Sequence, residues 1–131
     1  METYGFLSGD DPKYKSTVLA IQKELEHKGL MYRYKNRDDF GLPSSAFTIC
    51  SFWLIKSLYI IGHKEEAIEK FDKLLSYSNH LGLFSEDLDF ETKRQLGNFP
   101  QAYSHLALIE TAMVLGGGKL SKEEQLLQII H

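Results

Sequence analysis

Between residues 46 and 61 the chain carries apolar side chains on nearly every face of one expected helix. Pro43-Ser44-Ser45 opens this helix, which runs to about Ile61 before Gly62. A helix that is apolar all round must be covered by other elements on most sides, whereas a surface helix needs only one apolar stripe. The sequence therefore predicts a central helix that is the most deeply buried element. It is too short to span a bilayer comfortably and contains Lys56, so no membrane span is expected.

The helix expected from Lys64 to about Ser78 has the opposite character. Its apolar residues form one stripe, and Glu66/Lys70 and Glu69/Lys73 form oppositely charged pairs four residues apart on the other side. One helix is thus predicted to be an inner helix and the next an outer one.

Caps and helical spacing predict three further helices. Asp11 as N-cap and Pro12 at the first helical position start one that closes at Lys28-Gly29. A capping box over Ser121–Glu124 starts a short last helix. Without a convincing strand pair, the predicted class is all-α, one domain over residues 1–131. The five expected helices lie at residues 12–28, 43–61, 64–78, 100–115 and 121–131.

Charge and cysteine content exclude several classes of protein. The net charge is −3, from 15 Lys and Arg against 18 Asp and Glu, and no basic stripe is present to follow a nucleic-acid backbone. One cysteine, Cys50, rules out an intrachain disulfide, and its apolar neighbours favour a buried thiol. The five histidines form no His-x-x-x-His pair, so no metal site is expected. The N-terminal residues do not resemble a signal peptide, which favours a cytoplasmic location.

The stretch GLFSEDLD, residues 82–89, combines carboxylates with large apolar side chains. Glu86, Asp87 and Asp89 are typical of an exposed loop, whereas Phe84 and Leu88 are typical of a core. The stretch lies in a long connection between two expected helices, and such connections in compact domains are often functional. By composition alone, an exposed run of charges remains the simpler interpretation.

Two aromatic residues and an arginine are further candidates for contact with a ligand. Tyr32 and Arg33, followed by Tyr34, lie in an expected non-helical connection, where they could stack on and hydrogen-bond a sugar or simply anchor the loop. Trp53 is most simply a core residue and is the third candidate for binding substrate.

Three phrases in this order resemble the C-terminal part of glycoside hydrolase family 15, the glucoamylase, glucodextranase and trehalase-type inverting α-glycosidases. They are DDFGLPSSAFTICSFWLIKSL, GHKEEAIEKFDKLLSYSNHLGLFSEDLD and RQLGNFPQAYSHLALIETA. The resemblance runs from about Gly5 to Leu115. The shorter phrases CSFWL, GL-x-SED-x-D and QLGNFPQA-x-SH are specific at this spacing.

The resemblance implies a role for each carboxylate. In the family, the Glu of the GL-x-SE phrase is the general base, which corresponds here to Glu86. An inverting enzyme also needs an acid, roughly 6.5–9.5 Å from the base. In the family this acid lies well upstream of the base. The resemblance therefore implies that the part of the domain carrying the acid is absent from this chain. Asp87 and Asp89 are expected to shape the loop. The chemistry needs no cofactor.

The implied fold is the last part of an (α/α)6 toroid, about five helices. The expected function is that of a C-terminal segment of an enzyme hydrolysing α-linked glucosides, inactive alone and prone to self-association. Starch-like glucans, dextran-like glucans and trehalose all stay open as substrates. One alternative is a subunit that completes an active site with a separately encoded N-terminal part. Another is a non-catalytic helical interaction module, since residues 62–79 also resemble one helix of a tetratricopeptide-type repeat.

Overall fold

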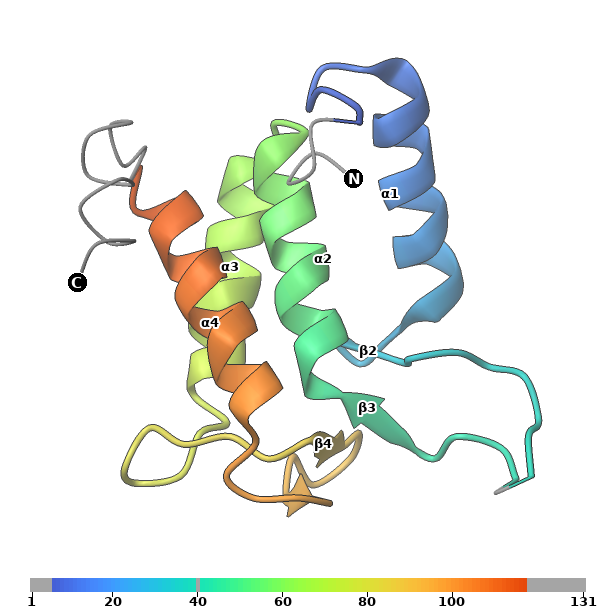
Figure 1. Ribbon diagram of the computed structural model, residues 1–131, viewed down its shortest axis with the longest axis vertical. Coiled ribbons are helices and arrows are strands. Elements are labelled where there is room, and N and C mark those ends of the chain that lie inside the picture. Colours follow the sequence, from blue (N-terminus) through green and yellow to red (C-terminus); the bar gives the residue numbers. More distant parts are fainter. Residues whose placement is uncertain (1–5, 40, 118–131) are drawn as a thin grey trace.

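Helix α2 (Thr48–Ile60) runs through the middle of the molecule (Figure 1). The computed structural model describes residues 6–39 and 41–117. Helices α3 (Lys64–Leu75) and α4 (Ala102–Leu115) pack on one side of α2, and α1 (Pro12–Leu25) lies on the other. Among these helices α2 has the most buried residues, which confirms its predicted central position. They are Thr48, Ile49, Ser51, Phe52, Leu54, Ile55 and Leu58.

Several predicted helix signals are confirmed. Asp11 caps α1, since its carboxylate accepts a hydrogen bond of 2.7 Å from the backbone N–H of Lys13. In α3, the Lys70 ammonium lies 3.8 Å from the Glu66 carboxylate, as the four-residue spacing predicts. Gly116 follows the end of α4. The helix predicted over residues 121–131 lies outside the described residues. No helix in the described part is both long and apolar enough to cross a bilayer.

Two short antiparallel sheets show that the all-α prediction is wrong. Strands β1 (Glu26–His27) and β2 (Leu30–Met31) form a hairpin. Its two turn residues, Lys28 and Gly29, have φ angles of 50° and 77°, as a type I′ turn requires. Lys28-Gly29 therefore closes a hairpin, and α1 already ends at Leu25.

The second sheet has the order β3-β4-β5, formed by β3 (Ser45–Phe47), β4 (Asp87–Asp89) and β5 (Gln95–Leu96). It lies at the end of α2 where that helix begins (Figure 1). The predicted start of the central helix, at residues 43–47, is partly strand because it pairs with a segment far along the chain. The predicted all-α class, with about five helices of a partial (α/α)6 toroid, is replaced by four helices and two small sheets in the described residues.

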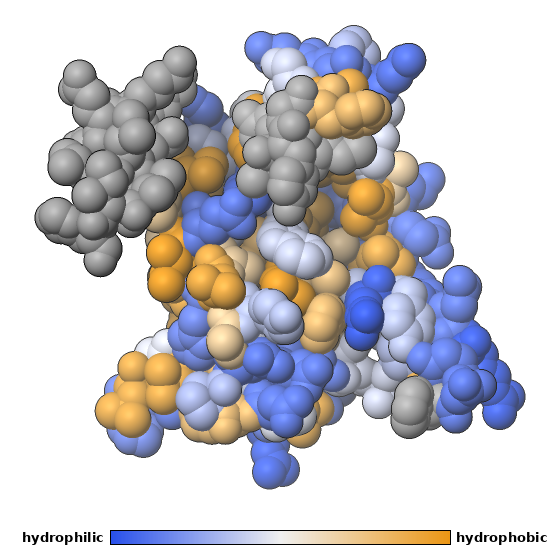
Figure 2. Space-filling view, in the orientation of Figure 1, coloured by the Kyte–Doolittle hydropathy of each residue, from blue (hydrophilic) through white to orange (hydrophobic). Residues whose placement is uncertain are grey.

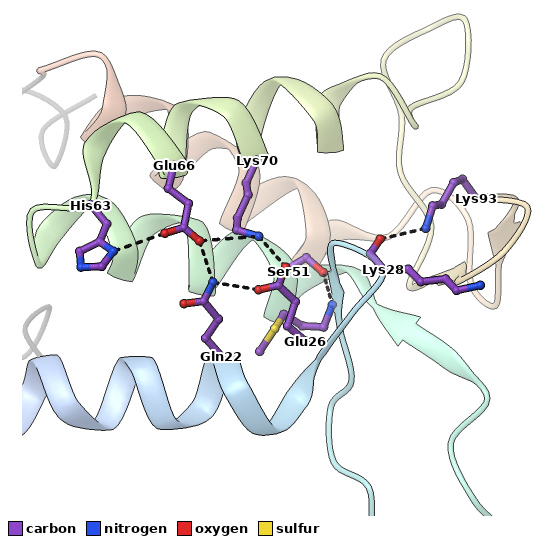
Figure 3. A network of polar contacts seen from close by, with 9 residues as sticks. Gln22, Glu26, Lys28, Ser51, His63, Glu66, Lys70 and Lys93 are labelled. Atoms are coloured by element: carbon purple, nitrogen blue, oxygen red, sulfur yellow. Dashed lines mark hydrogen bonds and ion pairs between the residues drawn. The ribbon is translucent and has the colours of Figure 1, made fainter.

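A polar network links α1 to α3 beside the β1–β2 hairpin (Figure 3). The Gln22 side-chain amide donates to Glu26 at 2.9 Å and to Glu66 at 2.7 Å, and Lys70 forms ion pairs with both carboxylates. Burial raises the pKa of Glu66, but hydrogen bonds from Gln22 and His63 and the charge of Lys70 outweigh it, so its pKa lies below the ordinary value. The network therefore holds α1 against α3 most firmly when Glu66 is ionised.

Candidate functional site

A pocket of about 260 Å³ lies between the segment around residues 33–47 and the start of β4. Two predicted site residues, Arg33 and Glu86, line it together. The remaining lining residues are Tyr34, Asp38, Gly41, Leu42, Pro43, Ser44, Ser45, Phe47 and Asp87. The pocket thus joins two segments that lie far apart in the sequence.

Apolar residues within GLFSEDLD hold Glu86 at this pocket. Phe84 and Leu88 are fully buried, whereas Glu86 is half-buried. The Phe84 ring packs edge-on against Phe52 of α2, with ring centroids 5.4 Å apart. The carboxylate therefore projects from a loop that is anchored on the core, which explains the mixed composition of this stretch.

Buried and partly buried polar contacts also fix this loop. The Gln95 side-chain oxygen accepts hydrogen bonds from the Ser85 backbone N–H at 2.6 Å and from the Ser85 hydroxyl at 2.7 Å. The Gln95 amide donates to the carbonyl of Tyr77 at 2.7 Å, and the Ser104 hydroxyl donates to the carbonyl of Ser85 at 2.9 Å. Gln95 and Ser104 were not predicted as site residues, although both lie in the QLGNFPQA-x-SH phrase.

The first turn of α4 also holds this loop. The Gln101 backbone N–H donates to the carbonyl of Phe84 at 2.9 Å, and the Phe84 N–H donates to Nε2 of His105 at 3.2 Å. Because Nε2 accepts, Nδ1 of His105 carries the proton and donates to the carbonyl of Gln101 at 2.7 Å. Both backbone groups of Phe84 are thus paired, so the loop next to Glu86 is rigidly held.

Hydrogen bonds also fix Glu86 itself. Its Oε2 accepts from the side-chain amide of Asn98 at 2.9 Å and from the Asn98 backbone N–H at 3.3 Å. The Glu86 N–H donates to the carbonyl of Asn98 at 2.8 Å, and the Glu86 carbonyl accepts from the N–H of Thr48 at 3.0 Å. The residue is therefore joined both to the segment after β5 and to the first turn of α2.

Asp87 lies in the same pocket but is held differently. Its carboxylate accepts a hydrogen bond of 2.5 Å from the hydroxyl of Ser45, which ties β4 to β3. Burial raises the pKa of Asp87 and the charge of Glu86 adds to this effect; the Ser45 hydroxyl and Arg33 only partly oppose it. The bond from Ser45 matches the loop-shaping role expected of Asp87, although its partner was not predicted.

Asp89 stabilises the turn between β4 and β5. Its Oδ1 accepts from the backbone N–H of Thr92 at 2.6 Å, from the Thr92 hydroxyl at 2.8 Å and from the N–H of Glu91 at 3.0 Å. These bonds, above all that from the Thr92 backbone, lower the pKa of Asp89. This contact matches the loop-shaping role expected of Asp89.

Aromatic rings hold Arg33 at the pocket. Its guanidinium carbon lies 5.2 Å from the ring centroid of Phe47 and 5.8 Å from that of Tyr34. Such cation–π contacts leave the N–H groups of the guanidinium able to donate to a ligand. Arg33 therefore offers hydrogen-bond donors in the same pocket as the Glu86 carboxylate.

Tyr32 and Trp53, the other two predicted substrate contacts, lie elsewhere. Both line a second, largely apolar pocket of about 170 Å³ between α1 and α2. Trp53 is 48% exposed, so it is not the core residue that its sequence context suggests. Cys50 lines this pocket too, and burial raises the pKa of its thiol to about 11. Within the described residues no three His, Cys, Asp or Glu side chains gather where they could hold a metal ion.

Comparison with known proteins identifies the family. Residues 1–113 match the family described as glycosyl hydrolases family 15. The chain is 46% identical over 111 residues to a trehalase of Mycolicibacterium smegmatis. The aligned region covers 82% of this chain and 17% of that trehalase. It is 45% identical over 111 residues to a trehalase of Mycobacterium tuberculosis, covering 82% of this chain and 16% of the relative.

A third relative comes from an archaeon. The chain is 35% identical over 123 residues to a trehalase of Thermoplasma volcanium, covering 93% of this chain and 20% of that protein. The chain thus spans a fifth or less of the length of these curated relatives. No solved structure matches it. The agreement between the family match and these three relatives, over most of its residues, shows that this chain belongs to glycosyl hydrolases family 15.

Proposed function

We propose that this chain is the part of an inverting α-glucoside hydrolase that carries the general base, Glu86. The observation that carries the proposal is that Glu86 and Arg33 line one pocket, with the loop of Glu86 anchored on the core. The names of the relatives favour trehalose as the α-glucoside. A cytoplasmic location and a single domain over residues 1–131 stay predictions.

In this proposal Glu86 takes a proton from the water that attacks the anomeric carbon. Asn98 donates both of its hydrogen bonds to Oε2 of Glu86, so Oε1 is the oxygen proposed to receive the proton. Arg33 is proposed to donate hydrogen bonds to sugar hydroxyls, as guanidinium groups do with oxygen acceptors. The reaction moves the water oxygen to the anomeric carbon as the glycosidic C–O bond breaks.

The leaving sugar oxygen needs a proton from a second carboxyl group, about 6.5–9.5 Å from the base. We propose that this general acid comes from an upstream part of the catalytic domain, outside this chain. The isolated chain is then inactive, because proton transfer to the leaving group and most of the sugar pocket are missing. A separately encoded polypeptide could supply that part equally well.

We expect the enzyme assembled from this chain and the upstream part to release one α- and one β-glucose from each trehalose. The attacked anomeric carbon inverts, whereas the leaving ring keeps its α configuration. Proton NMR of the first products, recorded before mutarotation, measures this ratio. The chain alone should hydrolyse neither trehalose, maltose nor an aryl α-glucoside. Release of α-glucose only would show retention and would contradict a general-base role for Glu86.

The isolated chain is predicted to self-associate through α4. One face of this helix exposes four large apolar residues at helical spacing, Tyr103, Leu106, Ile109 and Met113. Apolar side chains gather over α4 in the space-filling view (Figure 2). Covering such a surface gains about 25 cal/mol per Å². Analytical ultracentrifugation should therefore detect species larger than 15.0 kDa.

A matched pair of variants tests which surface associates. Leu106→Glu places a charge in the α4 face and should shift the population towards the monomer. Leu81→Glu adds the same charge at another exposed leucine, outside the helices, and should leave association unchanged. A monomeric wild-type chain at working concentration would show that the α4 face does not drive association in this way.

A further inference from the structure

We infer that Asn98 is a positioning residue for the reaction, because it fixes the carboxylate of Glu86 in one orientation. The inference rests on the proposed function. Asn98 acts through Glu86 and does not contact the substrate in this proposal. Its proposed effect is to keep Oε2 of Glu86 engaged, so that Oε1 stays turned towards the attacking water.

Three hydrogen bonds join the two residues. The Asn98 side-chain amide and backbone N–H both donate to Oε2 of Glu86, at 2.9 Å and 3.3 Å. In return the Glu86 N–H donates to the Asn98 carbonyl at 2.8 Å. Asn98 thus binds both the backbone N–H and the carboxylate of Glu86. Because both donors share one oxygen, they restrict rotation of the carboxylate about its last bond.

Gly97 makes this arrangement possible. Its φ angle of 73° is one that residues with a side chain rarely adopt. A Cβ atom at this position would lie 3.1 Å from Oε2 and 3.3 Å from Cβ of Glu86. Glycine therefore lets the chain after β5 approach the Glu86 side chain closely enough for Asn98 to donate to it.

The exposure of Asn98 separates positioning from folding. Asn98 is an exposed residue, whereas the residues that anchor the loop, Phe84, Ser85 and Leu88, are fully buried. Hydrogen bonds to an ionised acceptor are stronger than those between neutral groups. Loss of the Asn98 side chain removes the shorter of the two bonds to Oε2 and leaves only the longer one from the backbone N–H, so the carboxylate of Glu86 should become freer to rotate while the loop and the core stay in place.

The first test uses Asn98→Ala in the enzyme assembled with the upstream part of the domain. We expect kcat for trehalose to fall by up to about 10²-fold, the loss that misplacing a reacting group by about 1 Å can cause, with KM near its wild-type value. Asn98→Ser, which keeps a donor, should recover part of the rate. Glu91→Ala is the control, because Glu91 lies in the neighbouring turn and its carboxylate forms a solvent-exposed ion pair with Lys28, so kcat should stay at the wild-type value.

Sodium azide distinguishes positioning from a structural defect. Azide is a nucleophile that needs no base: its nitrogen forms a bond to the anomeric carbon as the glycosidic C–O bond breaks. The leaving oxygen takes a proton from the general acid, giving glucosyl azide and glucose. Azide should accelerate the Asn98→Ala enzyme severalfold and form glucosyl azide, with little effect on the wild type. A slow Asn98→Ala enzyme that does not respond to azide would overturn the inference.

The outcomes separate this inference from the proposed function. If Glu86→Gln keeps full activity, the general-base assignment is wrong. If Glu86→Gln is inactive and Asn98→Ala keeps the wild-type kcat, only the role of Asn98 is wrong. In the chain alone, the side-chain amide signals of Asn98 in a ¹⁵N–¹H NMR spectrum should move in Glu86→Gln and stay in place in Glu91→Gln. Unchanged signals in Glu86→Gln would also contradict the inference.

Discussion

Replacing Glu86 with glutamine in the enzyme assembled with its upstream part is expected to lower kcat for trehalose by about 10²- to 10⁴-fold, the usual contribution of a general base. Glutamine keeps the shape of the side chain and can still accept from Asn98, but it cannot take a proton from water. Steady-state hydrolysis of trehalose measures the loss. Thermal unfolding of the same variant should match the wild type, because Phe84 and Leu88 still anchor the loop.

Three amide substitutions serve as controls for this experiment. Asp87→Asn and Asp89→Asn should cost less activity, because an amide oxygen can still accept the bonds from Ser45 and from the turn at Thr92. Glu91→Gln removes an equivalent charge at a solvent-exposed ion pair with Lys28 and should leave kcat unchanged. An enzyme that tolerates Glu86→Gln but is inactivated by Asp87→Asn would show that the base is the neighbouring carboxylate.

Truncating Phe84 to alanine is expected to lower the free energy of unfolding of this chain by about 3–5 kcal/mol. The ring is fully buried and packs edge-on against Phe52. Its loss removes apolar contacts and leaves a cavity where the GLFSEDLD loop meets α2. Since a typical domain has only about 5–15 kcal/mol of stability in total, the variant should be close to unfolding. Urea denaturation followed by circular dichroism measures the change.

Phe99→Ala is the matched control for Phe84→Ala. The Phe99 side chain is about half exposed, at 47%, so its truncation should change the free energy of unfolding far less. Surface substitutions usually stay within about 0.5 kcal/mol. Equal losses at the two positions would mean that burial of Phe84 does not anchor the loop as described.

The helices could largely be predicted from local sequence, whereas the sheets could not. The apolar residues of 46–61 lie on nearly every helical face, which alone predicts a central, buried helix. Asp11 and Pro12 predict the start of the first helix from their own residue types. Strand β3 has only the three residues Ser45–Phe47, too few to show alternation. Its partner, β4, lies far along the chain. Pairing between such distant segments overrides a local helix signal and leaves no trace in helical spacing.

In the candidate site, too, the features set by local sequence were predictable and those set by distant contacts were not. The family phrases led to Glu86, and its neighbours Phe84 and Leu88 are buried, as their large apolar side chains predicted. The separation of Arg33 from Tyr32 was not predicted, although side chains of adjacent residues in an extended segment point to opposite sides. Arg33 lines the pocket of Glu86, and Tyr32 faces the pocket beside Trp53. Polar residues such as Gln95 looked like ordinary loop residues, because their partners are set only by the fold.

The bond between the Thr48 N–H and the Glu86 carbonyl has a consequence for cooperativity. The N–H groups of a first helical turn have no partner within the helix and need acceptors from elsewhere. Here the backbone of the proposed base supplies one to the central helix. Fraying of the first turn of α2 and detachment of the Glu86 loop both break this hydrogen bond, so each is expected to promote the other. Local unfolding at the two segments should have a shared free energy, so the site can lose its order only together with one end of the core.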